Sequence, residues 1–388
     1  MIVSPADRLK NVGEYYFSQK LEAIRKMRER GLDVISLGIG SPDLAPPPEA
    51  VAAATAAIAD EKNHGYASYR STPELRKSMS AWYQSTYGVA VDAETEILPL
   101  LGSKEGILYL SMALLNPGDG VLLPNPGYPA YSSVASLLGA KAHVYDLTEK
   151  SGWLPDLDLL EKQDLKGVKL MWVNYPHMPT GKVAERTFFD RLVKFAAKHR
   201  ILVCNDNPYG LVLNTTPPMS LLSTDPEKKY TAELNSFSKS FNMAGWRVGM
   251  FLGAKELVDC VLQVKSNVDS GMFLAVQAGA AAAMKTSPKW HEARNAVYRE
   301  RREIVWKIFD RLGFKYEKDQ VGLFVWAKAP DAVKDVAQFL DRILEEANVF
   351  LTPGMIFGSN GLRYARASLC APSGRLKEAL QRIEGFKP

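Results

Sequence analysis

Short apolar runs alternate with longer amphipathic stretches through most of the chain. Each run ends in a polar turn rich in Gly, Pro, Asn or Ser, which is typical of buried strands joined by helices. The runs that we predict as strands are residues 34–37, 97–100, 120–123, 141–145, 169–174, 201–205, 233–237 and 249–252. Strands that alternate with helices predict an α/β fold with a mostly parallel sheet and right-handed crossovers.

The amphipathic and alanine-rich stretches predict the helices. Residues 19–30 place Leu21, Ile24 and Met27 on one face. Helices are also expected at residues 48–59 and 185–199, after the turn at 102–106, and from Pro73, which suits a first helical turn. The most apolar window, residues 272–284, is too short to span a bilayer, so we predict a buried helix there.

The pattern changes at about residue 289. A long charged helix to about residue 312 precedes strand-like pieces at residues 321–327, 349–352 and 362–369, with helices between them. We therefore predict a large domain over residues 39–285 and a smaller α+β domain over residues 286–388. Residues 1–38 are expected to pack with the smaller domain.

Composition argues against several function classes. The 388 residues carry a net charge of +5 with both signs interspersed, so neither nucleic acid nor a membrane surface is indicated as a partner. The three cysteines are widely spaced and form no Cys-x-x-Cys pair, so no metal site is predicted. The N-terminus has no apolar run of the signal-peptide kind. A reducing, cytoplasmic location is therefore expected.

Polar residues gather directly after several of the predicted strands. Residues 102–106, 124–131, 206–209 and 235–249 all occupy such positions. Because open α/β sheets bind ligands at the carboxyl ends of their strands, these turns predict one shared site. The turn at 102–106 opens a helix, whose free N–H groups suit a phosphate. It has the spacing of neither a Walker A loop nor a dinucleotide-binding Gly-x-Gly-x-x-Gly motif.

The reactive chemistry is concentrated around Lys239. This lysine stands among Ser236, Ser238 and Ser240, and Arg247 follows in a Gly-Trp-Arg-Val-Gly segment. A lysine that loses its proton readily can bind an aldehyde covalently, while hydroxyls and a guanidinium fork hold a phosphate. Together these residues predict pyridoxal 5'-phosphate as a cofactor. Taken alone, a serine-rich loop with solvated cations is the commoner explanation of such a segment.

Other residues supply what a pyridoxal phosphate site requires. Asp206 can pair with the pyridinium nitrogen, which makes the ring an electron sink. Tyr209 can donate to the phenolic oxygen, and Tyr128, in a Pro/Gly loop, can stack on the ring. The phosphate cup would be formed by Gly102, Ser103, Ser236 and Arg247. Each residue alone has a structural explanation as a turn former, a cap or a half-buried aromatic. Coincidence of the full set is far less common, so the set favours a cofactor site.

These motifs resemble those of the fold-type I, pyridoxal-phosphate-dependent aminotransferases of class I/II, and the resemblance covers nearly the whole chain. It rests on Ser-x-Ser-Lys239 with Gly-Trp-Arg247-Val-Gly, Asp206-x-x-Tyr209, Pro-x-Pro-Gly-Tyr128, Gly102-Ser103-Lys104-Glu-Gly and Pro179-Thr-Gly. It implies that the large domain contains a mostly parallel sheet of the seven-stranded type, with helices packed on both of its faces. It also places Lys104 and Ser238 among the cofactor contacts.

The resemblance implies roles for further residues. Lys239 would be the Schiff-base lysine and catalytic base, Arg366 would bind the substrate's α-carboxylate as a bidentate pair, and Gly40 would lie near the substrate. Tyr66 would reach the cofactor phosphate of the neighbouring subunit, so a homodimer is expected. The implied reaction is a ping-pong transfer between an L-amino acid and a 2-oxo acid, with 2-oxoglutarate and glutamate as one pair. The turn sequences are similar to the diaminopimelate, alanine and methionine-type branch.

Two residues depart from the family's pattern. Met178 stands where the family has the Asn of Asn-Pro-Thr-Gly, which donates to the cofactor's phenolic oxygen. Unless His177 or Asn174 replaces that donor, Tyr209 remains alone, and we expect a raised pKa for the imine that Lys239 forms. Ser71 stands where the family often has Gly, which puts the shape of the active-site loop in question.

Two other functions remain open at this stage. A carbon–sulfur β-lyase could use the same cofactor residues, because nothing in the motifs separates the two reactions. A non-catalytic sensor that binds pyridoxal phosphate is less favoured, because such proteins usually carry a DNA-binding module and the scaffold here starts near residue 12.

Overall fold

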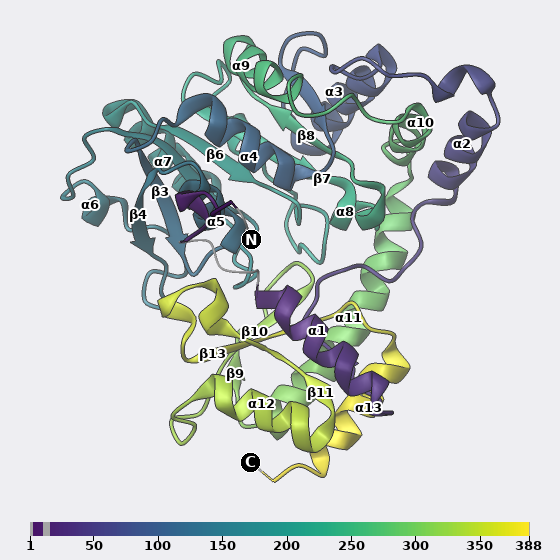
Figure 1. Ribbon diagram of the computed structural model, residues 1–388, viewed down its shortest axis with the longest axis vertical. Helices are drawn as coiled ribbons and strands as arrows, with labels where there is room; N and C mark the ends of the chain where they lie inside the picture. Colours follow the sequence, from purple (N-terminus) through teal and green to yellow (C-terminus); the bar gives the residue numbers. More distant parts are fainter. Residues whose placement is uncertain (1–2, 11–15, 388) are drawn as a thin grey trace.

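The computed structural model describes residues 3–10 and 16–387. A seven-stranded sheet forms the centre of the upper, larger lobe in Figure 1. Its strands, in spatial order, are β2 (Ile97–Leu100), β8 (Gly249–Leu252), β7 (Thr231–Ser236), β6 (Leu202–Asp206), β5 (Val168–Val173), β3 (Gly120–Asn125) and β4 (Lys141–Asp146). β8 runs antiparallel to both of its neighbours, and the other pairs are parallel. The predicted α/β fold with a mostly parallel sheet is confirmed.

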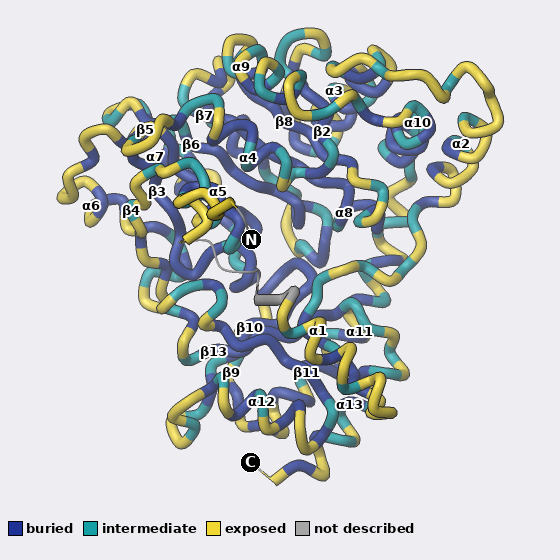
Figure 2. Tube along the Cα trace, in the orientation of Figure 1, coloured by how far each residue is buried: buried dark blue, intermediate teal, exposed yellow. Residues whose placement is uncertain are grey.

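Both faces of this sheet are buried except along the edge strand β4, which is largely exposed, and side chains alternate between the faces. On β5, Leu170 and Trp172 join one apolar cluster, whereas Met171 and Val173 join another on the opposite face. The helices of the first face are α4 (Ser103–Leu114), α5 (Pro129–Leu137) and α9 (Lys255–Lys265). Those of the second face are α7 (Arg186–His199), α3 (Pro73–Tyr87) and α10 (Leu274–Ala283), with α2 (Pro48–Ile58) packed on α10. Figure 2 shows the sheet as a mostly buried layer between these helices.

The smaller lobe is built on an antiparallel sheet. Its strands, in spatial order, are β12 (Thr352–Pro353), β13 (Tyr364–Ser368), β10 (Phe324–Lys328) and β9 (Lys315–Tyr316). The helices of this lobe, α12 (Val336–Ala347) and α13 (Ser373–Glu384), share its apolar core. The long helix α11 (Pro288–Arg311) runs between the two lobes (Figure 1). A division into domains at residues 38 and 285 stays a proposal.

The N-terminal segment from α1 (Tyr16–Glu29) onward lies against the smaller lobe, whereas the turn Asp7–Leu9 contacts α5 of the larger lobe. Helix α1 begins before the predicted start at residue 19, and β1 (Ile35–Ser36) pairs in parallel with β11 (Val349–Phe350). Ile24 and Val34 pack on Leu344 and Phe350. Asp33 accepts a hydrogen bond from Arg375 at 2.6 Å. None of the helices in residues 3–10 and 16–387 has the length and apolar character needed to cross a bilayer.

Two predicted strands differ from the observed ones by more than a shift of two residues at an end. The run at residues 349–352 divides into β11 and β12, because its two halves pair with different sheets. The run at residues 321–327 becomes a strand only from Phe324, because Gly322 has a φ of 84° and forms a turn. The remaining short helices are α6 (Leu157–Leu160), α8 (Phe237–Ser240) and the 3-10 turns Asp7–Leu9, Glu61–His64, Leu221–Thr224, Ala244–Trp246, Gly354–Phe357 and Ser359–Gly361.

Candidate active site

A cavity of about 570 Å³ lies where the carboxyl ends of the large sheet's strands meet the smaller lobe. The predicted site residues that line it are Gly40, Ser103, Lys104, Tyr128, Asp206, Tyr209, Ser236, Ser238, Lys239, Arg247 and Arg366. Gly102 adjoins the cavity through Arg247, and Tyr66 does not line it. The structure thus brings residues from seven separate chain segments to one place.

Asp206 ends β6, and its carboxyl group is buried beside the cavity. The Oδ2 atom accepts a hydrogen bond from the Tyr131 hydroxyl at 3.0 Å, and the Tyr131 ring stacks on Trp172 at a centroid distance of 5.2 Å. Burial raises the pKa of Asp206 to about 7, although donation by Tyr131 and Ser103 opposes the rise. The Oδ1 atom is buried without a hydrogen-bond partner. A cationic N–H donor, such as a pyridinium, would satisfy that oxygen and restore the carboxylate.

Lys239 is presented by the single-turn helix α8. Ser236 caps this helix by accepting a hydrogen bond from the Ser238 N–H at 3.2 Å. The Lys239 Nζ atom donates to the carbonyl of Gly40 across the cavity. Burial lowers the pKa of Lys239; the cations Arg366 and Arg247 act in the same direction, and Cys370 opposes them. The amine is therefore easier to deprotonate than an exposed lysine, as a nucleophile or base requires.

Gly102 and Arg247 form a close pair at the N-terminus of α4. Gly102 has a φ of 92°, and a Cβ atom there would lie 2.1 Å from Nη2 of Arg247. The Arg247 guanidinium donates to the carbonyls of Ala244 at 2.9 Å and Leu101 at 3.3 Å, which fixes its plane. Free N–H groups at a helix start beside an arginine are well suited to a phosphate.

Two tyrosines reach the cavity from separate loops. Tyr128 follows β3, and its ring meets Tyr131 edge-on at a centroid distance of 5.6 Å. Tyr209 meets Phe324 edge-on at 6.1 Å. Burial raises the pKa of the Tyr209 hydroxyl, so it keeps its proton and can donate at neutral pH. Their stacking and donor roles stay predictions.

Arg366 enters the cavity from β13 of the smaller lobe. Its guanidinium lies over the rings of Phe324 and Phe357, at 3.8 and 4.6 Å from their centroids, and Nη2 donates to the Gly38 carbonyl at 2.7 Å. A Cβ atom on Gly40 would lie 2.2 Å from Phe324, so only glycine fits beside this ring. A planar cation held between aromatic rings is oriented for a carboxylate.

Met178 is buried in the cavity wall, with its sulfur 3.2 Å from Nη1 of Arg366. The two candidate replacements for the missing donor are both engaged elsewhere. His177 does not line the cavity, and its Nδ1 atom meets the Thr180 hydroxyl at 2.8 Å. Asn174 does line it, but its amide donates to the Asp206 carbonyl and accepts from the Met178 N–H at 2.8 Å.

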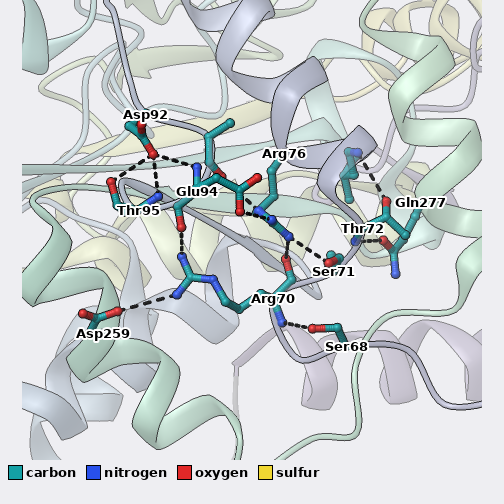
Figure 3. Close-up of polar contacts among 12 residues, drawn as sticks. Ser68, Arg70, Ser71, Thr72, Arg76, Asp92, Glu94, Thr95, Asp259 and Gln277 are labelled. Atoms are coloured by element: carbon teal, nitrogen blue, oxygen red, sulfur yellow. Dashed lines mark hydrogen bonds and ion pairs between the residues drawn. The ribbon is translucent and has the colours of Figure 1, made fainter.

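Tyr66 lies on a loop at the surface and is 93% exposed. Figure 3 shows how the chain just after it is held: Arg76 donates to the Ser71 carbonyl at 2.9 Å, and the Thr72 N–H donates to Gln277 at 2.8 Å. Ser71 has a φ of 62°, which is the left-handed conformation that glycine adopts readily. The loop therefore has a glycine-type bend despite the serine.

Several residues of the cavity were not predicted from the sequence. Phe324, Phe357 and Ile39 line it, and Tyr131 orients Asp206 from behind Tyr128. Tyr131 could have been noticed, because it shares the Pro/Gly loop of Tyr128. The two phenylalanines, one on β10 and one in the turn Gly354–Phe357, had no local signal, because buried Phe residues usually belong to the core.

The comparisons with known proteins agree with this geometry. The family described as aminotransferase class I and II matches residues 32–383. An LL-diaminopimelate aminotransferase of Dehalococcoides mccartyi is 37% identical over 381 residues, with 98% of each chain covered. Transaminase BacF of Bacillus subtilis is 38% identical, with 99% of this chain and 96% of the relative covered.

Solved structures show the same similarity. A substrate-bound structure of Bacillus subtilis BacF superposes with a TM-score of 0.92 at 38% identity and covers 99% of this chain and 98% of its own. A probable N-succinyldiaminopimelate aminotransferase of Thermus thermophilus gives a TM-score of 0.88 at 33% identity, covering 95% of this chain and 99% of its own. The fold, the motifs and these matches together show that the chain belongs to the class I and II aminotransferases, enzymes that use pyridoxal 5'-phosphate.

Proposed function

We propose that this aminotransferase moves an amino group between an L-amino acid and a 2-oxo acid in a two-stage, ping-pong reaction, with 2-oxoglutarate and glutamate as one pair. The observation that carries the proposal is the meeting of three groups in one cavity: the Lys239 amine, the Asp206 carboxyl and the Arg366 guanidinium. Each supplies one function that transamination needs, namely a base, a counter-charge to the cofactor ring and a carboxylate anchor.

The residues present fit pyridoxal 5'-phosphate, which supplies an electrophilic aldehyde and a ring that withdraws electrons from the substrate's α-carbon. Asp206 would keep the ring nitrogen protonated through its unpaired Oδ1 atom. Gly102 and Arg247 would hold the phosphate. Lys239 would bind the aldehyde and, once the substrate displaces it, move the α-proton, a task for which its lowered pKa suits it.

Arg366 would bind the α-carboxylate in both half-reactions, because both substrates share that group. Its guanidinium is already oriented by two aromatic rings and the Gly38 carbonyl. The names of the relatives make LL-diaminopimelate a donor to test first. Three cysteines without disulfides fit a cytoplasmic location, which we also propose.

A homodimer would complete the site. Tyr66 is 93% exposed and lies outside the cavity of its own chain, yet its loop is firmly held through Ser71 and Thr72. We therefore assign Tyr66 to the cofactor phosphate of a second subunit. Mixing Lys239→Ala chains with Tyr66→Ala chains tests this assignment. Mixed dimers would contain one site with neither change, so activity should exceed that of either parent; activity no higher than the parents would contradict it.

A panel of amino donors tests the reaction itself. The purified enzyme with cofactor is given LL-diaminopimelate, glutamate, aspartate, alanine, methionine and phenylalanine, and the cofactor's absorbance is followed with and without 2-oxoglutarate. An aminotransferase converts the cofactor to its amine form with at least one donor and turns over only when a 2-oxo acid is added. Release of pyruvate and ammonia from a sulfur amino acid without 2-oxo acid would show a β-lyase. No conversion with any donor would indicate a sensor.

A further inference from the structure

Glu233 is a buried carboxylate on the opposite side of the sheet from Asp206. It lies on β7 with 0% exposure. In the register of β6 and β7, Glu233 pairs with Asn205, and the next pair is Asp206 with Leu234. Because side chains alternate along a strand, Asn205 and Glu233 share one face and Asp206 points to the other, where the cavity lies.

Four hydrogen-bond donors converge on the Glu233 carboxylate. Oε1 accepts from the Tyr83 hydroxyl at 2.8 Å and from the Asn207 amide at 3.3 Å. Oε2 accepts from the Asn205 amide at 3.0 Å and from the Leu221 N–H at 2.9 Å. Burial raises the pKa of Glu233, and the donors on both oxygens oppose that rise and favour the ionised form. Among the residues that the structure describes, no Lys, Arg or His forms an ion pair with it.

Two of these donors flank the residue that faces the cofactor. Asn205 and Asn207 are the chain neighbours of Asp206, and both are attached to the same carboxylate. This double attachment fixes the end of β6 and hence the direction of the Asp206 side chain. The Glu233 charge also contributes to raising the pKa of Asp206, after burial as the main cause.

The same network reaches the lysine segment. The Tyr83 hydroxyl, which donates to Glu233, accepts from the Asn235 amide at 3.1 Å. The Asn235 Oδ1 atom accepts from the Ser236 N–H at 2.8 Å, at the point where the helix that carries Lys239 begins. Two further titratable groups interact with the Glu233 charge, Tyr87 of α3 and Cys204 of β6. Burial is the main cause of their raised pKa, and the Glu233 charge adds to it. Hydrogen bonds therefore connect the Glu233 carboxylate both to the end of β6, which carries Asp206, and to the segment that carries Lys239.

We propose that Glu233 is a positioning residue for the reaction: it sets the placement of Asp206 against Lys239 and adds a fixed negative charge behind the Asp206 carboxylate. This inference rests on the cofactor role proposed for Asp206. It goes beyond packing, because a residue that only filled space would not alter the affinity for a cationic ring or the protonation of the group bound to Lys239.

Glu233→Gln tests the proposal, because it keeps the shape and removes the charge. Each carboxylate oxygen accepts two of the four hydrogen bonds, so the amide nitrogen would also face two donors and lose those hydrogen bonds. We expect the apoenzyme's dissociation constant for pyridoxal 5'-phosphate to rise about tenfold, the effect of one charge-assisted hydrogen bond. The pKa read from the absorbance of the cofactor bound to Lys239 should fall, because a nearby negative charge that favours the protonated form is lost.

Glu96→Gln is the matched control. Glu96 forms an ion pair with the buried Lys228 at 3.0 Å and does not line the cavity. Its loss should lower the melting temperature without changing the affinity for the cofactor or the absorbance pKa. Tyr83→Phe removes one donor and leaves the Glu233 charge, so a smaller rise in the dissociation constant is expected. This variant decides the question if Glu233→Gln does not fold.

Wild-type affinity and wild-type absorbance pKa in Glu233→Gln would overturn the inference. The same is true if Glu233→Gln does not fold and Tyr83→Phe binds the cofactor with wild-type affinity. Asp206→Asn and Lys239→Ala separate this failure from a failure of the proposed function. If they weaken cofactor binding while Glu233→Gln does not, only the role of Glu233 is wrong. If Asp206→Asn also binds normally, the assignment of the cofactor site is wrong.

Discussion

The sulfur of Met178 lies 3.2 Å from Nη1 of Arg366, although 188 residues separate the two in the chain. The thioether thus occupies a donor position of the arginine that we assign to the substrate's carboxylate. Sulfur is a weak acceptor, so a carboxylate displaces it at little cost. Methionine at this position also supplies no N–H to the cofactor's phenolic oxygen.

Met178→Asn should lower the pKa read from the absorbance of the cofactor bound to Lys239. An asparagine amide can donate to the phenolic oxygen, which stabilises the deprotonated form of the chromophore. One added hydrogen bond to a charged group predicts a shift of roughly one pKa unit. Titration of the absorbance measures it, with Met178→Leu as the control that adds no donor. An unchanged or raised pKa in Met178→Asn would contradict the explanation.

The stability of the apoenzyme should depend on the protonation of Asp206. The pKa of this group is raised from 3.8 to about 7 in the folded chain by burial. Between these values the folded state binds more protons than the unfolded state. The free energy of unfolding therefore falls as pH rises towards 7, by at most about 1.4 kcal/mol per pH unit from this group.

Asp206→Asn should flatten that part of the pH dependence, because the amide does not titrate. Urea unfolding of both apoenzymes between about pH 5 and pH 7 measures the difference, and other titrating groups cancel in the comparison. Equal slopes would show that Asp206 does not titrate in this range.

The reactive centre could be predicted from the sequence where it follows strand ends. Asp206, Tyr209 and Lys239 come after buried strands, and parallel strands bring their carboxyl ends to one edge. The contacts that tune these residues could not be predicted in that way. Tyr131 reaches Asp206 from helix α5, and the Phe324 and Phe357 rings beside Arg366 come from other segments of the smaller lobe, so no local spacing records them. The predicted limits of one strand were wrong at residues 349–352, because this run divides into two strands that belong to different sheets.

Ser71→Gly should stabilise the fold. Ser71 is buried with a φ of 62°, a conformation that costs an L-residue about 1 kcal/mol and glycine almost nothing. Part of the gain is offset by the greater freedom of glycine in the unfolded chain, so the unfolding free energy should rise by roughly 0.5 kcal/mol. Chemical denaturation measures this, and Ser71→Ala should show no gain. A loss of stability in Ser71→Gly would show that the hydroxyl matters more than the backbone.

Gly102→Ala should weaken the binding of pyridoxal 5'-phosphate and leave phosphate-free pyridoxal little affected. The new methyl group would lie 2.1 Å from Nη2 of Arg247, so the guanidinium must leave the proposed phosphate cup. Loss of one charge-assisted contact predicts at least a tenfold weaker affinity. Gly118→Ala is the matched control: Gly118 has a similar φ of 89°, but a Cβ atom there meets nothing within 4 Å. Both variants place alanine at a positive φ, so equal loss of affinity in the two would trace the effect to backbone strain instead of to Arg247.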